Sequence, residues 1–113
     1  MNESDRERLR HMLDASREAL SFIEGRSSDE LLTDRMLLLS LVKEIEIVGE
    51  AAARVSNEYR AEARSIPWSV VVGIRNRLVH GYFDLNLDVI WSTLTDDLPP
   101  LVVALEKALS ESG

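Results

Sequence analysis

The chain has 113 residues, enough to bury roughly two-thirds of its unfolded surface in one folded unit without disulfide or metal staples. It has no cysteine and only two histidines, which excludes a disulfide framework, thiolate chemistry and a four-ligand zinc site. Its net charge of −7 argues against a nucleic-acid partner unless the basic residues are clustered.

The N-terminal sequence, MNESDRERLR, is charged from its start, and no apolar run reaches the ~20 residues that a membrane span needs. We therefore expect no signal peptide, no membrane partner and a cytoplasmic location. Leu, Ala, Glu and Arg dominate the composition, which is typical of packed helices.

The first predicted helix has an apolar stripe at helical spacing and ends near Gly25. Its stripe consists of Leu9, Met12, Leu13, Leu20 and Ile23. The second begins at Ser27, which forms a capping-box pattern with Glu30, and runs to about Val55 or beyond. This helix is apolar over more than one stripe, so it needs more than one neighbour. It is either central or part of a dimer interface.

A third helix is predicted from about Pro67 to His80. The preceding segment, NEYRAEARSIP, loses the helical period, and Pro67 suits the first turn of a helix because its missing N–H has no intrahelical partner there. Gly81 is placed to end this helix in a left-handed cap.

The fourth helix is expected to start near Asp84 or Asn86, which are both good caps. Pro99 and Pro100 remove two donors from its interior, so we expect a kink, or a break with Asp97 capping a separate last helix. Four amphipathic helices joined by short loops predict an all-α fold: an antiparallel four-helix bundle forming a single domain over residues 1–113.

The octet RNRLVHGY, residues 75–82, lies in the only basic segment of the chain. Residues 54–83 hold five basic and two acidic side chains, against seven and twelve in residues 1–53 and one and six in residues 84–113. Charge counting leaves two interpretations open. The arginines either balance neighbouring acidic helices or face a phosphate.

The octet combines the groups that cleave RNA through its own 2′-hydroxyl. The guanidinium of Arg75 is a planar fork that can bind two phosphate oxygens. The imidazole of His80, with an ordinary pKa of about 6.5, suits proton transfer near neutrality. Because the nucleophile belongs to the substrate, this chemistry needs no metal and no cofactor. Asp96 and Asp97, beside the double proline, are interpreted as caps and not as metal ligands.

Helix geometry limits how the octet can work. Five residues rotate by about 500°, which leaves Arg75 and His80 some 140° apart, whereas Asn76 shares a face with His80. The first pair converges only if the helix unwinds near Gly81 or if a second protomer completes the site. Asn76 is a local hydrogen-bonding residue that could fix the tautomer of His80.

Other side chains have plainer interpretations. Arg75 and Arg77 could pair with Glu46 and Glu50 of the second helix, a role we expect for one of the two arginines. Two tryptophans, Trp68 and Trp91, are interpreted as core residues instead of base-stacking platforms, and His11 as a solvated residue.

The stretch IPWSVVVGIRNRLVHGYFDLNLDVIW, followed by DLPPL, resembles the HepT-type toxins of the HEPN superfamily. Their mark is an arginine, four to six residues, and a histidine, matched here by Arg75 and His80. The toxin subgroup adds a tyrosine two positions later, matched by Tyr82. The segment DRMLLLSLVKEIEIVGEAA resembles the family's long second helix, so the similarity covers most of the chain.

The resemblance implies an all-helical homodimer whose two Arg-x4-His segments meet in a shared cleft and cleave RNA without metal. Arg75 would hold the scissile phosphate and His80 would act as acid and base, with Asn76 and Arg77 in support. It also implies a partner, a nucleotidyltransferase antitoxin that transfers AMP to Tyr82.

Three functions remain open at this stage. The first is the ribonuclease toxin, and the second is a non-catalytic HEPN module that docks a nucleotidyltransferase or binds a nucleotide. The third is a purely structural helical dimer. The combination of Arg75, His80 and Tyr82 favours the first.

Overall fold

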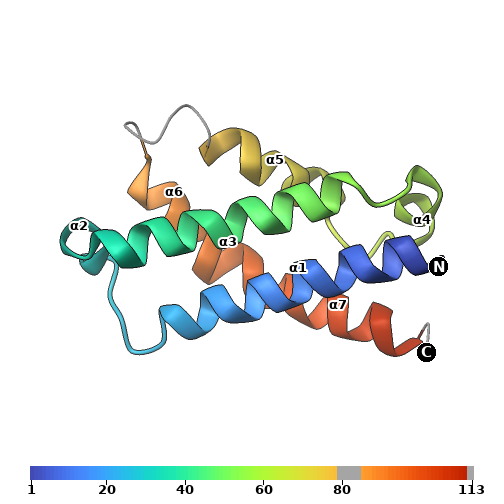
Figure 1. The fold of residues 1–113 in the computed structure, drawn as a ribbon, viewed down its shortest axis with the longest axis horizontal. Helices are drawn as coiled ribbons and strands as arrows, with labels where there is room; N and C mark the ends of the chain where they lie inside the picture. The colour runs from blue at the N-terminus through green and yellow to red at the C-terminus, as the bar shows by residue number, and fades with distance from the viewer. Residues whose placement is uncertain (79–84, 112–113) are drawn as a thin grey trace.

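A computed structural model describes residues 1–78 and 85–111, and within these the chain is helical with no strand (Figure 1). The elements are α1 (Glu3–Phe22), α2 (Glu30–Thr33), α3 (Arg35–Ala53), α4 (Asn57–Glu62), α5 (Trp68–Leu78), α6 (Leu87–Ser92), the π-helical η1 (Thr93–Asp97) and α7 (Leu98–Glu111). The predicted all-α fold is confirmed. In the described part, no helix combines the length and apolar character needed to cross a bilayer.

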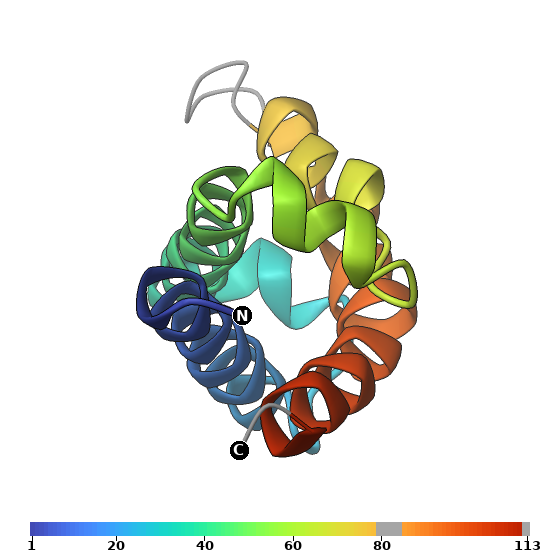
Figure 2. The same cartoon turned by 90° about the vertical axis from the view of Figure 1, so that its right-hand side faces the viewer.

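The long helices form an antiparallel bundle. α3 packs against α1 on one side and α5 on the other, and α1 also contacts α7. Consecutive long helices run in opposite directions, and the end-on view shows them around a common centre (Figures 1 and 2). Because α3 packs against both α1 and α5, it needs apolar side chains on more than one stripe, as its sequence shows.

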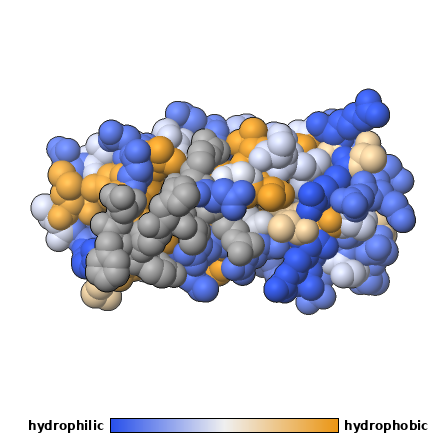
Figure 3. Space-filling model, turned by 90° about the horizontal axis from the view of Figure 1, so that it is seen from above, coloured by the Kyte–Doolittle hydropathy of each residue, from blue (hydrophilic) through white to orange (hydrophobic). Residues whose placement is uncertain are grey.

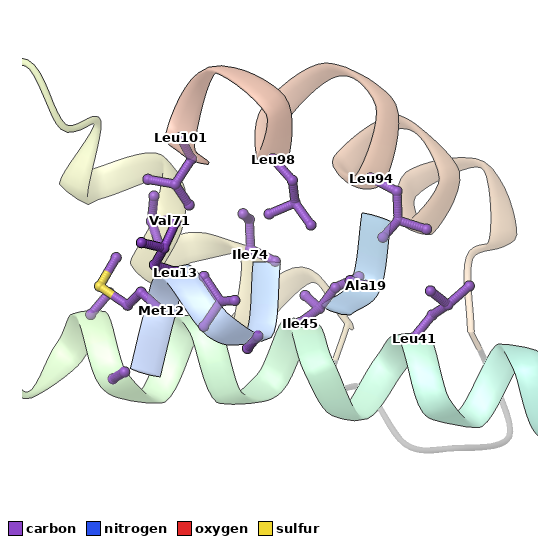
Figure 4. Close-up of a cluster of buried hydrophobic side chains, with 14 of the residues drawn as sticks. Met12, Leu13, Ala19, Leu41, Ile45, Val71, Ile74, Leu94, Leu98 and Leu101 are labelled. Atoms are coloured by element: carbon purple, nitrogen blue, oxygen red, sulfur yellow. The ribbon is translucent and has the colours of Figure 1, made fainter. Parts of the chain in front are cut away.

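The core fills the space between these helices. Side chains from α1, α3 and α5 converge on those of η1 and α7 (Figure 4). The labelled residues are Met12, Leu13, Ala19, Leu41, Ile45, Val71, Ile74, Leu94, Leu98 and Leu101. All of them are buried, so the predicted apolar stripes are the faces that the bundle encloses.

The predicted second helix is divided in two, which corrects the sequence interpretation. Asp34 leaves the helical conformation (φ −113°, ψ 92°), and its Oδ1 accepts a 3.0 Å hydrogen bond from the backbone N–H of Leu37, which caps α3. Arg26 donates to the other carboxylate oxygen at 3.2 Å. Capping therefore prevails over continuation of the helix at this position. Glu30 accepts from the N–H of Ser27, which is half of the predicted capping box.

A short helix that the sequence did not predict, α4, lies within the segment expected to be irregular. Ser56 caps it by accepting a 3.2 Å hydrogen bond from the N–H of Tyr59. No α4 residue is buried, which explains why the apolar period is lost there. The next helix begins as expected, because Pro67 directly precedes Trp68 and its carbonyl accepts from the N–H of Val71.

The last helix is interrupted before its prolines, as predicted, but not by a cap at Asp97. Asn86 caps α6 through a 3.1 Å hydrogen bond from the N–H of Val89. The chain then widens into η1, where the N–H of Leu98 bonds to the carbonyl of Thr93, five residues back. Asp97 belongs to this π-helical turn, and the two prolines follow in the first turn of α7, where missing donors cost little.

Candidate functional site

The residues of the octet that the structure describes lie on the C-terminal half of α5. Val71 and Ile74 are buried and hold this helix against α3. At the start of α5, the indole N–H of Trp68 donates a 3.0 Å hydrogen bond to the carbonyl of Ala63. A helix fixed at its start and along one face gives Arg75, Asn76 and Arg77 a defined backbone position.

Only part of the predicted site lies within the described residues. Asn76 is exposed on α5. His80, Gly81 and Tyr82 lie outside the described residues, and so do the side chains of Arg75 and Arg77. The convergence of Arg75 with His80 and the role of Asn76 toward the imidazole therefore stay predictions.

The acidic partners proposed for the arginines are on α3, the helix against which α5 packs. Glu50 is exposed and Glu46 is half-buried. The two helices that such an ion pair would join, α3 and α5, are thus in contact. Which arginine meets which glutamate stays a prediction, because the arginine side chains are outside the described part.

The basic segment is divided by the fold. Arg54 ends α3, and Arg60 and Arg64 lie on and just after α4, whereas Arg75 and Arg77 are on the far half of α5. Seen from above, the end of the molecule around α4 and the N-terminus is largely hydrophilic, and apolar side chains gather at the opposite end, near α2 and α6 (Figure 3).

Arg60 has a structural role, which answers part of the question that charge counting left open. Its guanidinium donates a 2.8 Å hydrogen bond to the carbonyl of Ala52 near the C-terminus of α3. The same group lies 5.9 Å from the ring centre of Trp68, a cation–π contact. Tyr59 meets that indole edge-on, with ring centres 6.3 Å apart. This cluster joins α4 to α5, so Trp68 is part of the packing, as interpreted from the sequence.

Among residues 1–78 and 85–111, no three His, Cys, Asp or Glu side chains are grouped closely enough to hold a metal. Asp96 and Asp97 both lie in η1. His11 is exposed on α1 with Nε2 3.8 Å from Glu7, which confirms its interpretation as a solvated residue.

The structure also shows a pair of carboxyl groups that sequence reasoning missed. Glu44 of α3 is only 7% exposed, and its Oε2 is buried with no hydrogen-bond partner. Burial raises the pKa of Glu44 to about 7. A hydrogen bond with Glu18 on α1 and the negative charge of Glu18 act in the same direction. A sequence signal was available, because Glu44 interrupts a row of buried positions at helical spacing that includes Leu41 and Val48.

Comparison with known proteins gives one family. The model of the ribonuclease HepT-like family matches residues 12–108. A protein named as a candidate RNase from Caldanaerobacter subterraneus subsp. tengcongensis is 29% identical over 103 residues, covering 91% of this chain and 92% of its own. A protein named as a probable ribonuclease HepT from Thermococcus cleftensis is 30% identical over 79 residues, covering 70% and 72%.

A third relative, named as a candidate RNase from Methanocaldococcus jannaschii, is 26% identical over 98 residues and covers 87% of this chain and 90% of its own. No solved structure matches the chain at a significant level.

Proposed function

Because the chain belongs to the ribonuclease HepT-like family, we propose that it is the endoribonuclease toxin of a toxin–antitoxin system and cleaves RNA without a metal ion. The observation that carries this proposal is the sequence Arg75-x4-His80-Gly81-Tyr82, which falls inside the matched residues 12–108. A ribonuclease family supplies the substrate class, and these side chains supply a phosphate ligand and a proton-transfer group.

The proposed reaction is an internal transesterification. The 2′-oxygen of the RNA attacks the adjacent phosphorus, and the bond from phosphorus to the 5′-oxygen breaks. The proton of the 2′-hydroxyl leaves to a base, the departing 5′-oxygen gains a proton, and His80 serves these transfers near neutral pH. Arg75 binds the non-bridging oxygens and stabilises the charge that develops on them. The products are a 2′,3′-cyclic phosphate and a free 5′-hydroxyl.

A second copy of the chain is part of the proposal. Arg75 and His80 lie some 140° apart on an ideal helix, so one straight helix does not bring them together. In a homodimer whose two octets line one cleft, Arg75 and His80 can come together across the interface. The cleft then holds two imidazoles, one for each proton transfer. Asn76, exposed on α5, and Arg77 support the catalytic pair.

Regulation is proposed at Tyr82. A nucleotidyltransferase antitoxin would join AMP to its phenolic oxygen, forming a phosphodiester with release of pyrophosphate from ATP. The added negative charge, close to Arg75 in sequence, would occupy the guanidinium and repel the RNA backbone.

The proposal is tested by incubating the purified protein with a labelled RNA in the presence of excess EDTA. We expect cleavage with cyclic-phosphate ends, loss of cleavage in Arg75→Ala and His80→Ala, and full cleavage in His11→Ala, which removes the other histidine. Cleavage that requires a divalent metal and leaves a 5′-phosphate would overturn the mechanism. No cleavage by the dimer of any RNA tested would favour the non-catalytic HEPN module.

A further inference from the structure

A groove runs between the C-terminal half of α1 and the N-terminal half of α3, on helices other than the one that carries the octet. It consists of two adjoining hollows of about 390 and 500 Å³. Phe22 and Ser40 line both hollows, so the two form one continuous depression. Hollows of this size can receive side chains from a segment of another protein.

Large apolar side chains stand exposed along this groove. Phe22 is 36% exposed, Leu39 39% and Met36 82%. These three come from both helices and face the same depression. Apolar side chains grouped around a hollow and rimmed by polar residues are typical of a protein-docking surface.

An acidic pair lies in the smaller hollow of the groove. Glu44 lines the smaller hollow together with Glu18, and its buried Oε2 has no partner. Two carboxylates have no proton to donate to each other. Glu18 is exposed to water, so it is the buried Oε2 of Glu44 that needs a proton or a cation as its partner. Because Glu44 is buried, leaving its carboxylate without such a partner costs free energy.

The charged groups around the pair do not meet that requirement. Lys43 lines the same hollow from α3, but it is exposed and forms no ion pair in the described part of the chain. Arg26, in the larger hollow, is engaged with Asp34 at 3.2 Å and Glu30 at 3.6 Å. In residues 1–78 and 85–111, therefore, no cation of this chain neutralises the pair.

We propose that this groove docks a partner protein through a segment that presents an arginine or lysine between large apolar side chains. The cationic group enters between the carboxyl groups of Glu18 and Glu44, and the apolar side chains cover Phe22, Leu39 and Met36. Charge complementarity selects this occupant, because the acidic pair repels a nucleic-acid backbone and the exposed apolar side chains need an apolar counterpart. The site is separate from the RNA site proposed on α5 and does not depend on it.

The test uses the full chain and a fluorescein-labelled amphipathic peptide of about 15 residues, with one arginine flanked by leucines a helical turn away on each side. The control peptide has citrulline, the uncharged analogue, at the arginine. Fluorescence anisotropy at pH 7.5 should show saturable binding of the arginine peptide and at least about tenfold weaker binding of the citrulline peptide.

Protein variants then locate the binding site. Glu44→Gln should weaken binding of the arginine peptide about tenfold and remove its advantage over citrulline, because the charge pair is already lost. Asp14→Asn, an exposed change on α1, is the matched control and should bind as the wild type does. Circular dichroism of each variant shows whether the bundle is intact, and Glu18→Gln provides a second variant in case Glu44→Gln fails to fold.

The acidity of the pair adds a further measurement. The cation displaces a proton, so the affinity for the arginine peptide should rise as the pH increases from about 6 to 8, through the pKa of Glu44 near 7. Absence of saturable binding would overturn the proposal. Binding that is equal for both peptides, or unchanged in both Glu44→Gln and Glu18→Gln, would also overturn it.

Discussion

The carboxylate of Asp5, in the first turn of α1, holds Ser56 at the start of α4 through two hydrogen bonds. The backbone N–H of Ser56 donates to Oδ1 at 2.8 Å and its hydroxyl donates to Oδ2 at 2.6 Å. The same hydroxyl oxygen accepts from the N–H of Tyr59 and caps α4. Asp5 is buried, so this contact joins the N-terminus of the chain to the segment that leads into α5.

The first prediction concerns this contact. Asp5→Ala should lower the free energy of unfolding by about 2–3 kcal/mol, because it removes two hydrogen bonds to a charged group and leaves the partly buried N–H of Ser56 without a partner. Urea denaturation measures the loss. Asp14→Ala, an exposed aspartate on the same helix, should change stability by less than about 0.5 kcal/mol. Equal losses in the two variants would contradict the role given to Asp5.

The second prediction is a pH dependence from Glu44. Its pKa is raised from 4.5 to about 7 in the folded protein, so the folded state binds more protons than the unfolded state between these values. Stability from this group is complete below about pH 4.5 and is lost as the pH rises through about 7. A pKa raised from 4.5 to about 7 corresponds to a loss of stability on the order of 3 kcal/mol.

Glu44→Gln isolates this effect, since its amide can donate to Glu18 at every pH. The stability of the variant relative to wild type should therefore increase between about pH 5 and 8, measured by urea denaturation at each pH. Glu58→Gln, an exposed change on α4, should follow the wild-type curve. Asp34, whose pKa is lowered first by its hydrogen bond from Leu37, acts in the opposite sense and only at acid pH. A constant difference between Glu44→Gln and wild type would exclude a raised pKa.

The elements predicted from the sequence are those that contribute a stripe to the core. The long helices were found because apolar spacing is a local property that burial then satisfies. α4 was missed because it buries no side chain, and the break at Asp34 was missed because the apolar pattern continues on both sides of it. At that position a cap competes with helix continuation, and sequence spacing does not show which prevails.

The candidate site could be predicted less fully than the fold, for a physical reason. The meeting of Glu18 with Glu44 depends on how α1 and α3 are aligned, which is a non-local property. In the same way, the predicted approach of Arg75 to His80 would depend on the backbone after Leu78 or on a second chain, neither of which local spacing specifies. Residue types and spacing indicate the chemistry, whereas the geometry of a site depends on contacts between elements that are distant in the sequence.

A third prediction concerns the second chain. Light scattering at micromolar concentration should give a particle of twice the 12.7 kDa of one chain, because an interface of standard size buries on the order of 1,600 Å². If the cleft contains Arg75 of one protomer and His80 of its partner, mixing the inactive Arg75→Ala and His80→Ala proteins should restore part of the activity. A particle of 12.7 kDa would contradict the dimer.

The fourth prediction is made in cells. Expression of the wild type should arrest growth and degrade RNA, and Arg75→Ala and His80→Ala should be harmless yet fold. Two exposed residues of α1 provide matched controls, Arg10→Ala for the loss of a positive charge and His11→Ala for the loss of an imidazole. Both controls should remain toxic. Toxicity that persists in His80→Ala would show that growth arrest does not come from the proposed chemistry.

The last prediction separates two possible roles of Tyr82. If its phenol were the catalytic acid, Tyr82→Phe would lose the roughly 10²–10⁴-fold that a positioned proton donor supplies. We expect instead that Tyr82→Phe keeps most of its ribonuclease activity, because a phenol of ordinary pKa near 10 is a poor base at neutrality and His80 covers proton transfer.

The variant should escape neutralisation by a nucleotidyltransferase with ATP. Tyr59→Phe, which changes the half-buried tyrosine beside Trp68, should be neutralised normally. Mass spectrometry of the neutralised wild type should then show an AMP-sized addition at Tyr82 together with loss of RNA binding. A fully neutralised protein with an unmodified Tyr82 would mean that the antitoxin inhibits by docking alone.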